Sequence, residues 1–231
     1  MKDLISINKV RNKKFFKYFA VFTKNINSFP LIYLIIIYSF ALTKWVVWNQ
    51  KSIFLLWSGG EHLAEHIQFI FYLSSTLISF LNILKNKYRI LSLQNLCWIF
   101  FAIFTLFLAI EEVSHLNTMQ GGIFDFIRAN NTHNQINLHN HKFVQPYLHP
   151  VFILLNFFFG WIGWKYFSFI DAIPDKVFFL YFLFPAIAIA LLGFRKFGIY
   201  LPIHQEIFEF LMAMGLLLNG LKQLKKYSKN K

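Results

Sequence analysis

The sequence predicts an all-helical protein: a polytopic membrane bundle of about six transmembrane helices with both termini in the cytoplasm. Three observations predict this class. Of the 231 residues, 57% are hydrophobic and the mean hydropathy is +0.48. Apolar runs long enough to cross a bilayer recur along the chain. Of the 23 lysines and arginines, 21 lie in tails and connections between these runs, which is a topology signal and not a stripe that would bind nucleic acid.

The predicted elements follow in chain order. Residues 1–28 form a basic, Phe-rich segment, which is either an interfacial amphipathic helix on the anionic inner leaflet or a solvated tail. The membrane domain covers 29–224, with an outer loop at 111–149, and a basic tail at 225–231 follows. The predicted spans are 29–47, 67–84 (starting as early as 61), 91–110, 151–170, 177–193 and 203–221.

The orientation follows from the basic residues. With six spans, 16 lysines and arginines fall on the side of both tails and 5 on the opposite side, and the last two lie near helix ends. By the positive-inside rule, the tails are cytoplasmic. The sequence therefore predicts a multi-pass protein of the cell membrane, of the bacterial inner-membrane type, whose first partner is the lipid bilayer. It predicts no particular protein partner.

The glutamates and histidines are segregated. All 6 Glu and all 8 His fall on the predicted outer face, and none lies in a tail or a cytoplasmic connection. Charged groups near a membrane usually face the bundle interior and mark a site. Three helix ends carry them at helical spacing: Glu61, His62, Glu65 and His66; Glu111, Glu112 and His115; and Glu206 and Glu209. Carboxylates this close together must share protons, meet a cation or pair with basic side chains.

One interpretation of this cluster is a metal site. Glu112 and His115 form a Glu-x-x-His unit, the spacing used in di-metal carboxylate bundles. Imidazole with carboxylate suits zinc, iron or manganese. The candidate ligands are Glu65, Glu112, His115, His139 and Glu209. A proton-sharing polar network without metal, and an ordinary hydrogen-bonded cluster at helix ends, are the two alternatives. Cys97, the single cysteine, excludes a Cys-based zinc site.

The outer loop contains two distinct pieces. Residues 123–127 are amphipathic and are expected to lie on the membrane surface or to plug the bundle. The stretch "NNTHNQINLHNH", residues 130–141, is rich in amides and imidazoles. Such side chains suit an irregular backbone folded over the helix ends, or a polar head group or sugar. The alternative is a solvated, turn-rich loop.

The same loop carries a resemblance. Two blocks are involved: Glu111, Glu112, Val113 and Ser114, and then Asn131, Asn137, Leu138, His139 and Asn140. They resemble the E-E-I-S-W-G-Q and N-x-Q-x-E-x-N-L-H-N motifs of a group of small bacterial multi-pass membrane proteins of uncharacterised function. His115 departs from the motif, which has Trp there, and Gln135 stands in place of Glu. The resemblance implies no activity, but it favours Glu111, Glu112, His139 and Glu65 as site residues.

Three functions are consistent with these features. The first is an enzyme at the outer leaflet, dependent on a metal or on acid–base chemistry, that acts on a lipid or lipid-linked substrate. Its candidate catalytic residues are Glu111, Glu112, His139 and Glu65, supported by Glu61, His62, His66, Glu206, Asn137 and Asn140. The second is a transporter or proton-coupled carrier, and the third is an assembly or scaffold protein. The sequence does not decide whether the protein is an enzyme.

Overall fold

The computed structural model describes residues 28–48, 63–86, 91–112, 121–131, 141–193 and 201–229. These residues are almost entirely helical, and the only pairing of extended backbone among them is an isolated bridge between Asn131 and His141. The helices are α2 (Phe29–Trp48), α4 (Leu63–Lys85), α5 (Leu93–Glu111), α6 (Ile123–Ala129), α7 (Gln145–Phe157), the π-helical η2 (Phe158–Gly163), α8 (Trp164–Tyr166), the 3₁₀ turn η3 (Lys176–Phe178), α9 (Phe179–Gly193) and α10 (Leu201–Lys229).

Three stretches are long and apolar enough to cross a membrane. They are Glu65–Lys85, Leu93–Glu111 and Ile207–Lys229. Two shorter apolar helices cover Phe29–Ser39 and Lys176–Leu191. The all-helical class and the presence of membrane-length helices are therefore confirmed, whereas a total of six crossings stays a prediction.

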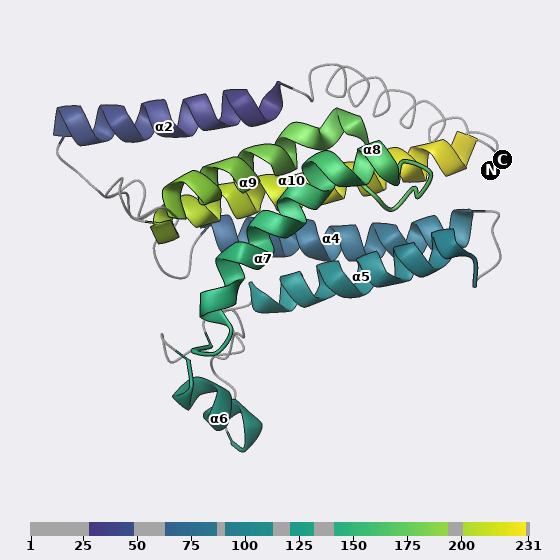
Figure 1. The fold of residues 1–231 in the computed structure, drawn as a ribbon, viewed down its shortest axis with the longest axis horizontal. Coiled ribbons are helices and arrows are strands. Elements are labelled where there is room, and N and C mark those ends of the chain that lie inside the picture. The colour runs from purple at the N-terminus through teal and green to yellow at the C-terminus, as the bar shows by residue number, and fades with distance from the viewer. Residues whose placement is uncertain are drawn as a thin grey trace, which may run out of the picture.

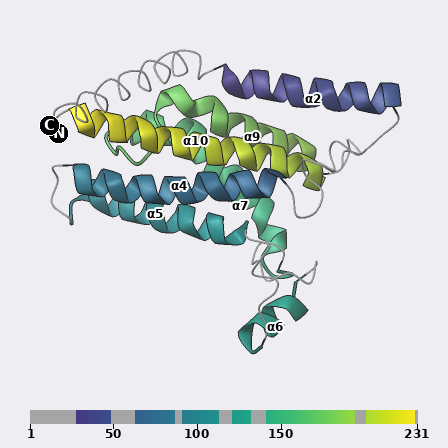
Figure 2. The same cartoon turned by 180° about the vertical axis from the view of Figure 1, so that it is seen from behind.

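The helices pack side by side with α10 in the middle (Figures 1 and 2). One side of α10 packs against α4, which packs in turn against α5, and the other side packs against α9. The continuous helical segment formed by α7, η2 and α8 covers α9. α2 lies at the edge of the bundle, where Phe29 and Tyr33 stack near Tyr181 and Phe210 with ring centroids 6.3 and 5.0 Å apart.

The central position of α10 is visible in its burial. In the most apolar part of its membrane-length stretch, 67% of the residues are buried, compared with 33% in the corresponding part of each of the other two stretches. Side chains such as Ile207, Leu211 and Leu216 are fully enclosed. By contrast, Leu77 on α4 and Phe100 on α5 point outward and are more than half exposed. Large exposed apolar side chains on adjacent helices are what a lipid-facing surface requires.

A row of buried polar side chains joins α4 to its neighbours. The Thr76 and Thr105 hydroxyls, on α4 and α5, lie 2.8 Å apart. Asn82 Nδ2 donates to the Gly220 carbonyl of α10 over 3.1 Å. Ser79 instead bonds back to the Ser75 carbonyl within α4, at 2.6 Å. The Thr76–Thr105 and Asn82–Gly220 contacts therefore link α4 to both of its neighbours, as polar side chains do between apolar helices.

Several element ends differ from the sequence prediction. The fourth predicted span begins at 151, but α7 begins at Gln145, and a proline in its first turn suits a helix start. That helical segment ends at Tyr166 and not at 170. α6 forms where an amphipathic segment was expected. It lies outside the packed helices and does not insert between them (Figure 1).

The last helix extends beyond its predicted end. α10 continues to Lys229, eight residues past the end of the sixth predicted span at 221. Tyr227 explains the extension, because only 7% of it is exposed. Its hydroxyl donates to Asp171 Oδ2 over 2.8 Å and accepts from Trp98 Nε1 over 3.3 Å. These contacts tie the final turns of α10 to the bundle.

We expect Gly215→Ala to destabilise the protein by about 1–3 kcal/mol, the usual cost of overpacking a core. A Cβ at this position of α10 would lie 2.8 Å from both Tyr181 Cβ and Phe182 Cζ of α9. The comparison is Gly220→Ala, where the Cβ would come within 3 Å of one side-chain atom, Ile78 Cγ2, so a smaller loss of stability is expected. Thermal unfolding of the purified protein in detergent measures both, and an equal effect of the two changes would contradict the prediction.

Candidate functional site

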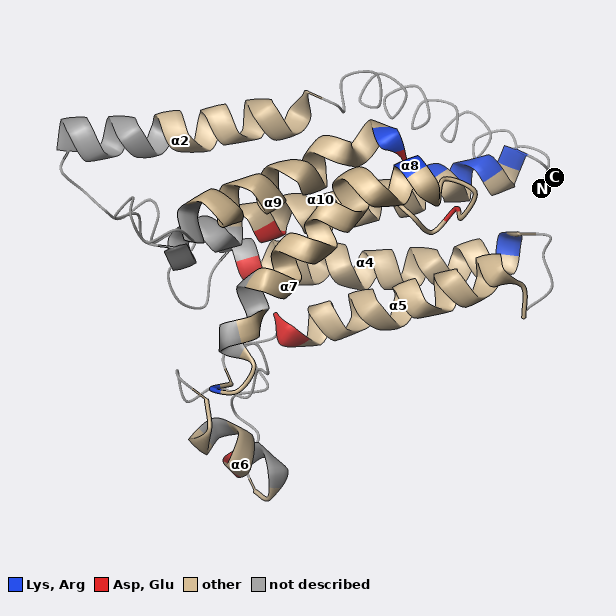
Figure 3. Cartoon of the chain, in the orientation of Figure 1, with Lys and Arg blue, Asp and Glu red and all other residues tan. Residues whose placement is uncertain are grey.

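Four described glutamates gather at one end of the bundle, called here the carboxylate end: Glu65, Glu111, Glu112 and Glu209. Glu65 lies in the first turn of α4, Glu111 ends α5 and Glu112 caps it, and Glu209 lies in the first half of α10. Three helices that are distant in sequence therefore each bring a carboxylate to this end. Figure 3 shows red segments there on α5 and α10.

Contacts between the helices fix the depth of each carboxylate. Phe71 packs near Phe210 and Asn82 bonds Gly220, so α4 and α10 run parallel with an offset of 138–139 residues. Thr76 faces Thr105 across the antiparallel pair of α4 and α5. By these registers, Glu111 and Glu209 are both level with residue 70 of α4. Glu65 lies five residues further out, or about 7 Å along the axis at 1.5 Å per residue.

The surroundings of the carboxylates are partly enclosed. All four glutamates are half-buried, and each takes part in at least one hydrogen-bonding or electrostatic contact. Gln68 lies one turn below Glu65 on the same face of α4 and is completely buried. Sequence reasoning missed Gln68, although its spacing of three residues from Glu65 was available as a signal.

The helix dipoles act differently on these carboxylates. Glu65 lies at the N-terminus of α4, where negative charge is favourable. Glu111 and Glu112 lie at the C-terminus of α5, where the backbone carbonyls make negative charge unfavourable by about 0.3–1 kcal/mol. The dipole of α5 therefore does not stabilise the charges of this glutamate pair, and their stabilisation must come from other contacts.

The remaining candidates are only partly placed. His66 is described and exposed. The backbone of Glu206 lies in α10, and its side chain is outside the described set. Six candidates lie outside the described residues: Glu61, His62, His115, Asn137, His139 and Asn140.

The described residues on either side of the stretch that contains His139 are paired. Asn131 and His141 form the isolated bridge, and Lys142 N donates to the Asn130 carbonyl over 3.0 Å. Asn131 is buried, with 3% of its surface exposed. Asn131 and His141 are therefore held next to each other, between α6 and α7.

The metal hypothesis is not established by the described residues alone. Among them, no three His, Cys, Asp or Glu side chains form a group suited to hold a metal ion. The two imidazoles in the predicted ligand set, His115 and His139, lie outside the described residues. A metal site at the carboxylate end therefore stays a prediction, as do the proton-sharing network and the simple hydrogen-bonded cluster.

The opposite end of the bundle, called here the basic end, contains a second polar cluster. The connection after α8 carries Asp171 and Asp175, which pair with α10 lysines: Lys226 Nζ lies 2.8 Å from Asp171, and Lys222 Nζ lies 2.6 Å from Asp175. Asn219 Oδ1 also accepts from the Asp175 backbone N–H over 3.3 Å. Figure 3 shows blue segments at this end of α4, α8 and α10.

These pairs were not predicted from the sequence, because the partners are separated by 47 and 55 residues. Partial burial by itself raises the pKa of Asp175, but the hydrogen bond and charge of Lys222, with two backbone N–H groups, outweigh this effect. The net result is a pKa below the ordinary value for aspartate.

No protein-family model, no curated protein and no solved structure matches the chain. The resemblance of the E-E-V-S and N-L-H-N blocks to a group of bacterial membrane proteins therefore stays a prediction.

We expect Asp175→Asn to reduce the amount by which the free energy of unfolding falls as the pH is lowered. A lowered pKa means that Asp175 contributes stability above its unfolded pKa and loses it as the pH falls through the folded pKa, below about pH 5. Because both partners are more than 40% exposed, solvent limits the contribution to about 0.2–1 kcal/mol.

Urea or thermal unfolding between about pH 3 and pH 7 measures the effect. Asp125→Asn on α6 is the matched control, because that carboxylate is exposed and accepts from a local backbone N–H, that of Gly121, four residues away. If wild type and Asp175→Asn lost the same stability as the pH fell, the lowered pKa of Asp175 would be refuted.

Proposed function

We propose that the protein is a multi-pass membrane enzyme whose carboxylate end faces the outer side of a bacterial-type inner membrane and acts on a lipid or lipid-linked substrate. The bundle crosses the membrane about six times, with both termini in the cytoplasm. The observation that carries the proposal is the register of α4, α5 and α10, which brings half-buried glutamates from three helices to one end, at neighbouring depths.

The membrane assignment is supported by length, surface and charge together. Three helices have the length and hydropathy of a span, and their outward faces are apolar. Lysines lie at the basic end, and the described glutamates lie at the other end (Figure 3). The positive-inside rule then assigns the basic end to the cytoplasm. The carboxylate end falls at the depth of the outer head groups.

The chemistry follows from the residue types at the carboxylate end. One carboxylate accepts a proton from an attacking water or hydroxyl, and a second, protonated group donates to the leaving oxygen. Glu111 and Glu112 are the preferred pair, because the dipole of α5 disfavours their charged forms and so favours a proton on one of them. In the metal-dependent variant of the proposal, His115 and His139 supply the imidazole ligands that the described carboxylates lack.

A carrier is less well supported by the interior of the bundle. The buried polar side chains of the described helices are amides and hydroxyls and include no ionisable Glu, His or Lys. Ser75, Thr76 and Ser79 bond back to carbonyls of their own helix, so these hydroxyls are satisfied locally. A proton relay through the bilayer would need titratable groups along that row.

The orientation is tested with single cysteines in a Cys97→Ala background. We expect a membrane-impermeant maleimide to label Lys142→Cys from outside intact cells, and Lys229→Cys only after permeabilisation. Lys142 and Lys229 are both exposed, and they lie toward opposite ends of the molecule. Labelling of Lys229→Cys in intact cells would refute the proposed topology.

The catalytic role is tested with Glu112→Gln. We expect the variant to fold with unchanged or slightly higher stability, because it removes a charge that the C-terminus of α5 disfavours. We also expect it to lose at least about 100-fold in the rate of its reaction, the usual size of a general acid–base contribution. Asp125→Asn, an exposed carboxylate on α6, is the control and keeps full function.

The readout is the lipid and lipid-linked profile of cells that lack the protein, complemented with each variant at equal protein level, together with the metal content of the purified protein. Restoration of the wild-type profile by Glu112→Gln would remove Glu112 from the mechanism. A profile that does not change when the protein is absent would refute the enzyme proposal itself. If the wild-type protein contained stoichiometric zinc, iron or manganese and Glu112→Gln did not, the metal-dependent form of the proposal would be favoured.

A further inference from the structure

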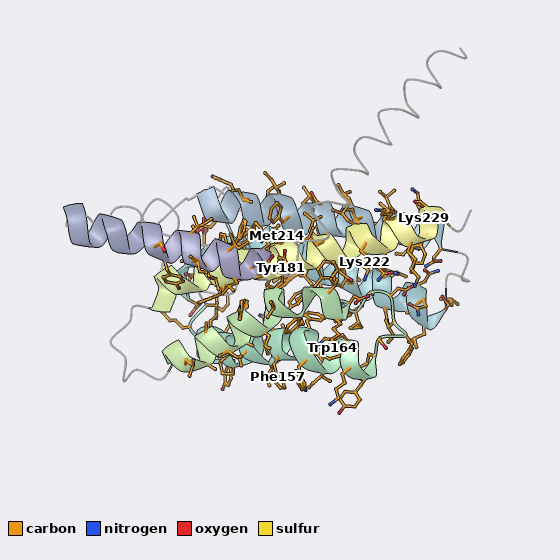
Figure 4. The ribbon with its side chains drawn as sticks, turned by 90° about the horizontal axis from the view of Figure 1, so that it is seen from above. Phe157, Trp164, Tyr181, Met214, Lys222 and Lys229 are labelled. Carbon is orange, nitrogen blue, oxygen red and sulfur yellow. The ribbon has the colours of Figure 1, made fainter. Side chains whose placement is uncertain are left out.

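A hollow of about 690 Å³ opens at the basic end, between the segment 164–176 and the last turns of α10. Its polar lining is dominated by two aspartates and five lysines: Asp171, Asp175, Lys176, Lys222, Lys225, Lys226 and Lys229. Figure 4 shows Trp164 on one side of this end of the molecule, with Lys222 and Lys229 along α10. The volume lies within the range of sites that hold a small ligand or a head group.

The hollow carries an excess of positive charge. Among its lining residues five lysines outnumber two aspartates, and Asp175 and Asp171 pair with Lys222 and Lys226. The four α10 lysines follow the spacing i, i+3, i+4, i+7, which places them on one face of the helix. Like charges at this spacing repel one another, so an anion in the hollow would relieve the repulsion.

The surroundings of the hollow match a membrane interface. Trp161, Tyr166 and Phe169 lie beside it and are largely exposed. Lys165 Nζ lies 5.5 Å from the centre of the Trp161 ring and 5.3 Å from that of Tyr166. Exposed aromatic rings mixed with lysines at the end of membrane-length helices mark the level of the head groups.

We propose that this hollow binds the phosphate of an anionic phospholipid in the inner leaflet. The lysines recognise the phosphate, and the apolar wall formed by Trp164, Ile170 and Ile173 accommodates the start of the glycerol and acyl region. A free phosphorylated metabolite shares the phosphate but has no use for the apolar wall or the exposed aromatic rim. The site lies at the opposite end from the proposed catalytic residues, and its assignment to the inner leaflet rests on the proposed topology.

The Asp–Lys pairs shape this site. Lys226 and Lys222 are held at the rim by Asp171 and Asp175, and Trp164 is fixed by the bond from its Nε1 to the Gly160 carbonyl at 2.8 Å. Lys176 Nζ in turn lies 5.3 Å from the centre of the Trp164 ring. The lining is therefore arranged before a ligand arrives, which reduces the entropy lost on binding.

The test uses the full-length protein in detergent micelles that contain phosphatidylcholine and increasing phosphatidylglycerol, with bound lipids counted by native mass spectrometry. We expect wild type to retain one phosphatidylglycerol in preference to phosphatidylcholine. We expect Lys225→Gln/Lys229→Gln to weaken this retention about 10- to 30-fold, since each lysine near a lipid surface contributes about a fivefold preference. The charge-matched control is Lys85→Gln/Lys165→Gln, whose lysines lie at the same end but outside the hollow.

Three results would overturn the proposal. Equal loss in the two double variants would indicate general surface attraction instead of a site. Equal retention of the two lipids by wild type would show that the hollow does not select an anion. Displacement of the bound lipid by millimolar inorganic phosphate would assign the hollow to a free phosphorylated ligand. None of these results depends on Glu112, so the lipid site and the proposed enzyme stand or fall separately.

Discussion

The close packing of α10 between α4 and α9 is the constraint on which the rest of the structure depends. At Gly215 and Gly220 the absence of a side chain lets Phe182 and Ile78 approach to distances that a Cβ would not tolerate. Apolar helices in lipid gain little from hydrophobic burial, so tight van der Waals contact and a few interhelical hydrogen bonds must hold them together. The Asn82 bond to the Gly220 carbonyl forms only because the two helices lie this close.

The register of α10 against α4 positions both polar ends of the molecule. α10 has 29 residues and extends about 43 Å at 1.5 Å per residue. Its first half carries Glu209 and its last turns carry the lysines that meet Asp171 and Asp175. A slip of one residue along the helix would move every one of these groups by about 1.5 Å and rotate it by about 100°. The contacts at one end therefore hold the geometry of the other.

Sequence reasoning predicted the helices well because their signal is local. Long apolar runs identified α4, α5 and α10 to within a few residues at most ends, and the spacing of Glu65, Glu111 and Glu209 placed all three at helix ends. The bond between Tyr227 and Asp171 could not be predicted, because 56 residues separate the partners and a single sequence does not show which distant residues pair. For the same reason, the extension of α10 to Lys229 was not foreseen.

In the candidate site, too, the local features could be predicted from the sequence and the contacts between distant segments could not. That carboxylates gather at one end followed from topology and charge segregation, which are properties of whole segments. That Gln68 is completely buried one turn below Glu65 required the packing of α4 against its neighbours. To see that the charges of Glu111 and Glu112 are unfavourable at the end of α5, one needs to know only where that helix ends. Glu65 differs from this pair, because its own helix favours its charge. Because α4 favours the charge of Glu65 whereas α5 disfavours the charges of Glu111 and Glu112, any stabilisation of the α5 pair must come from groups outside its own helix dipole.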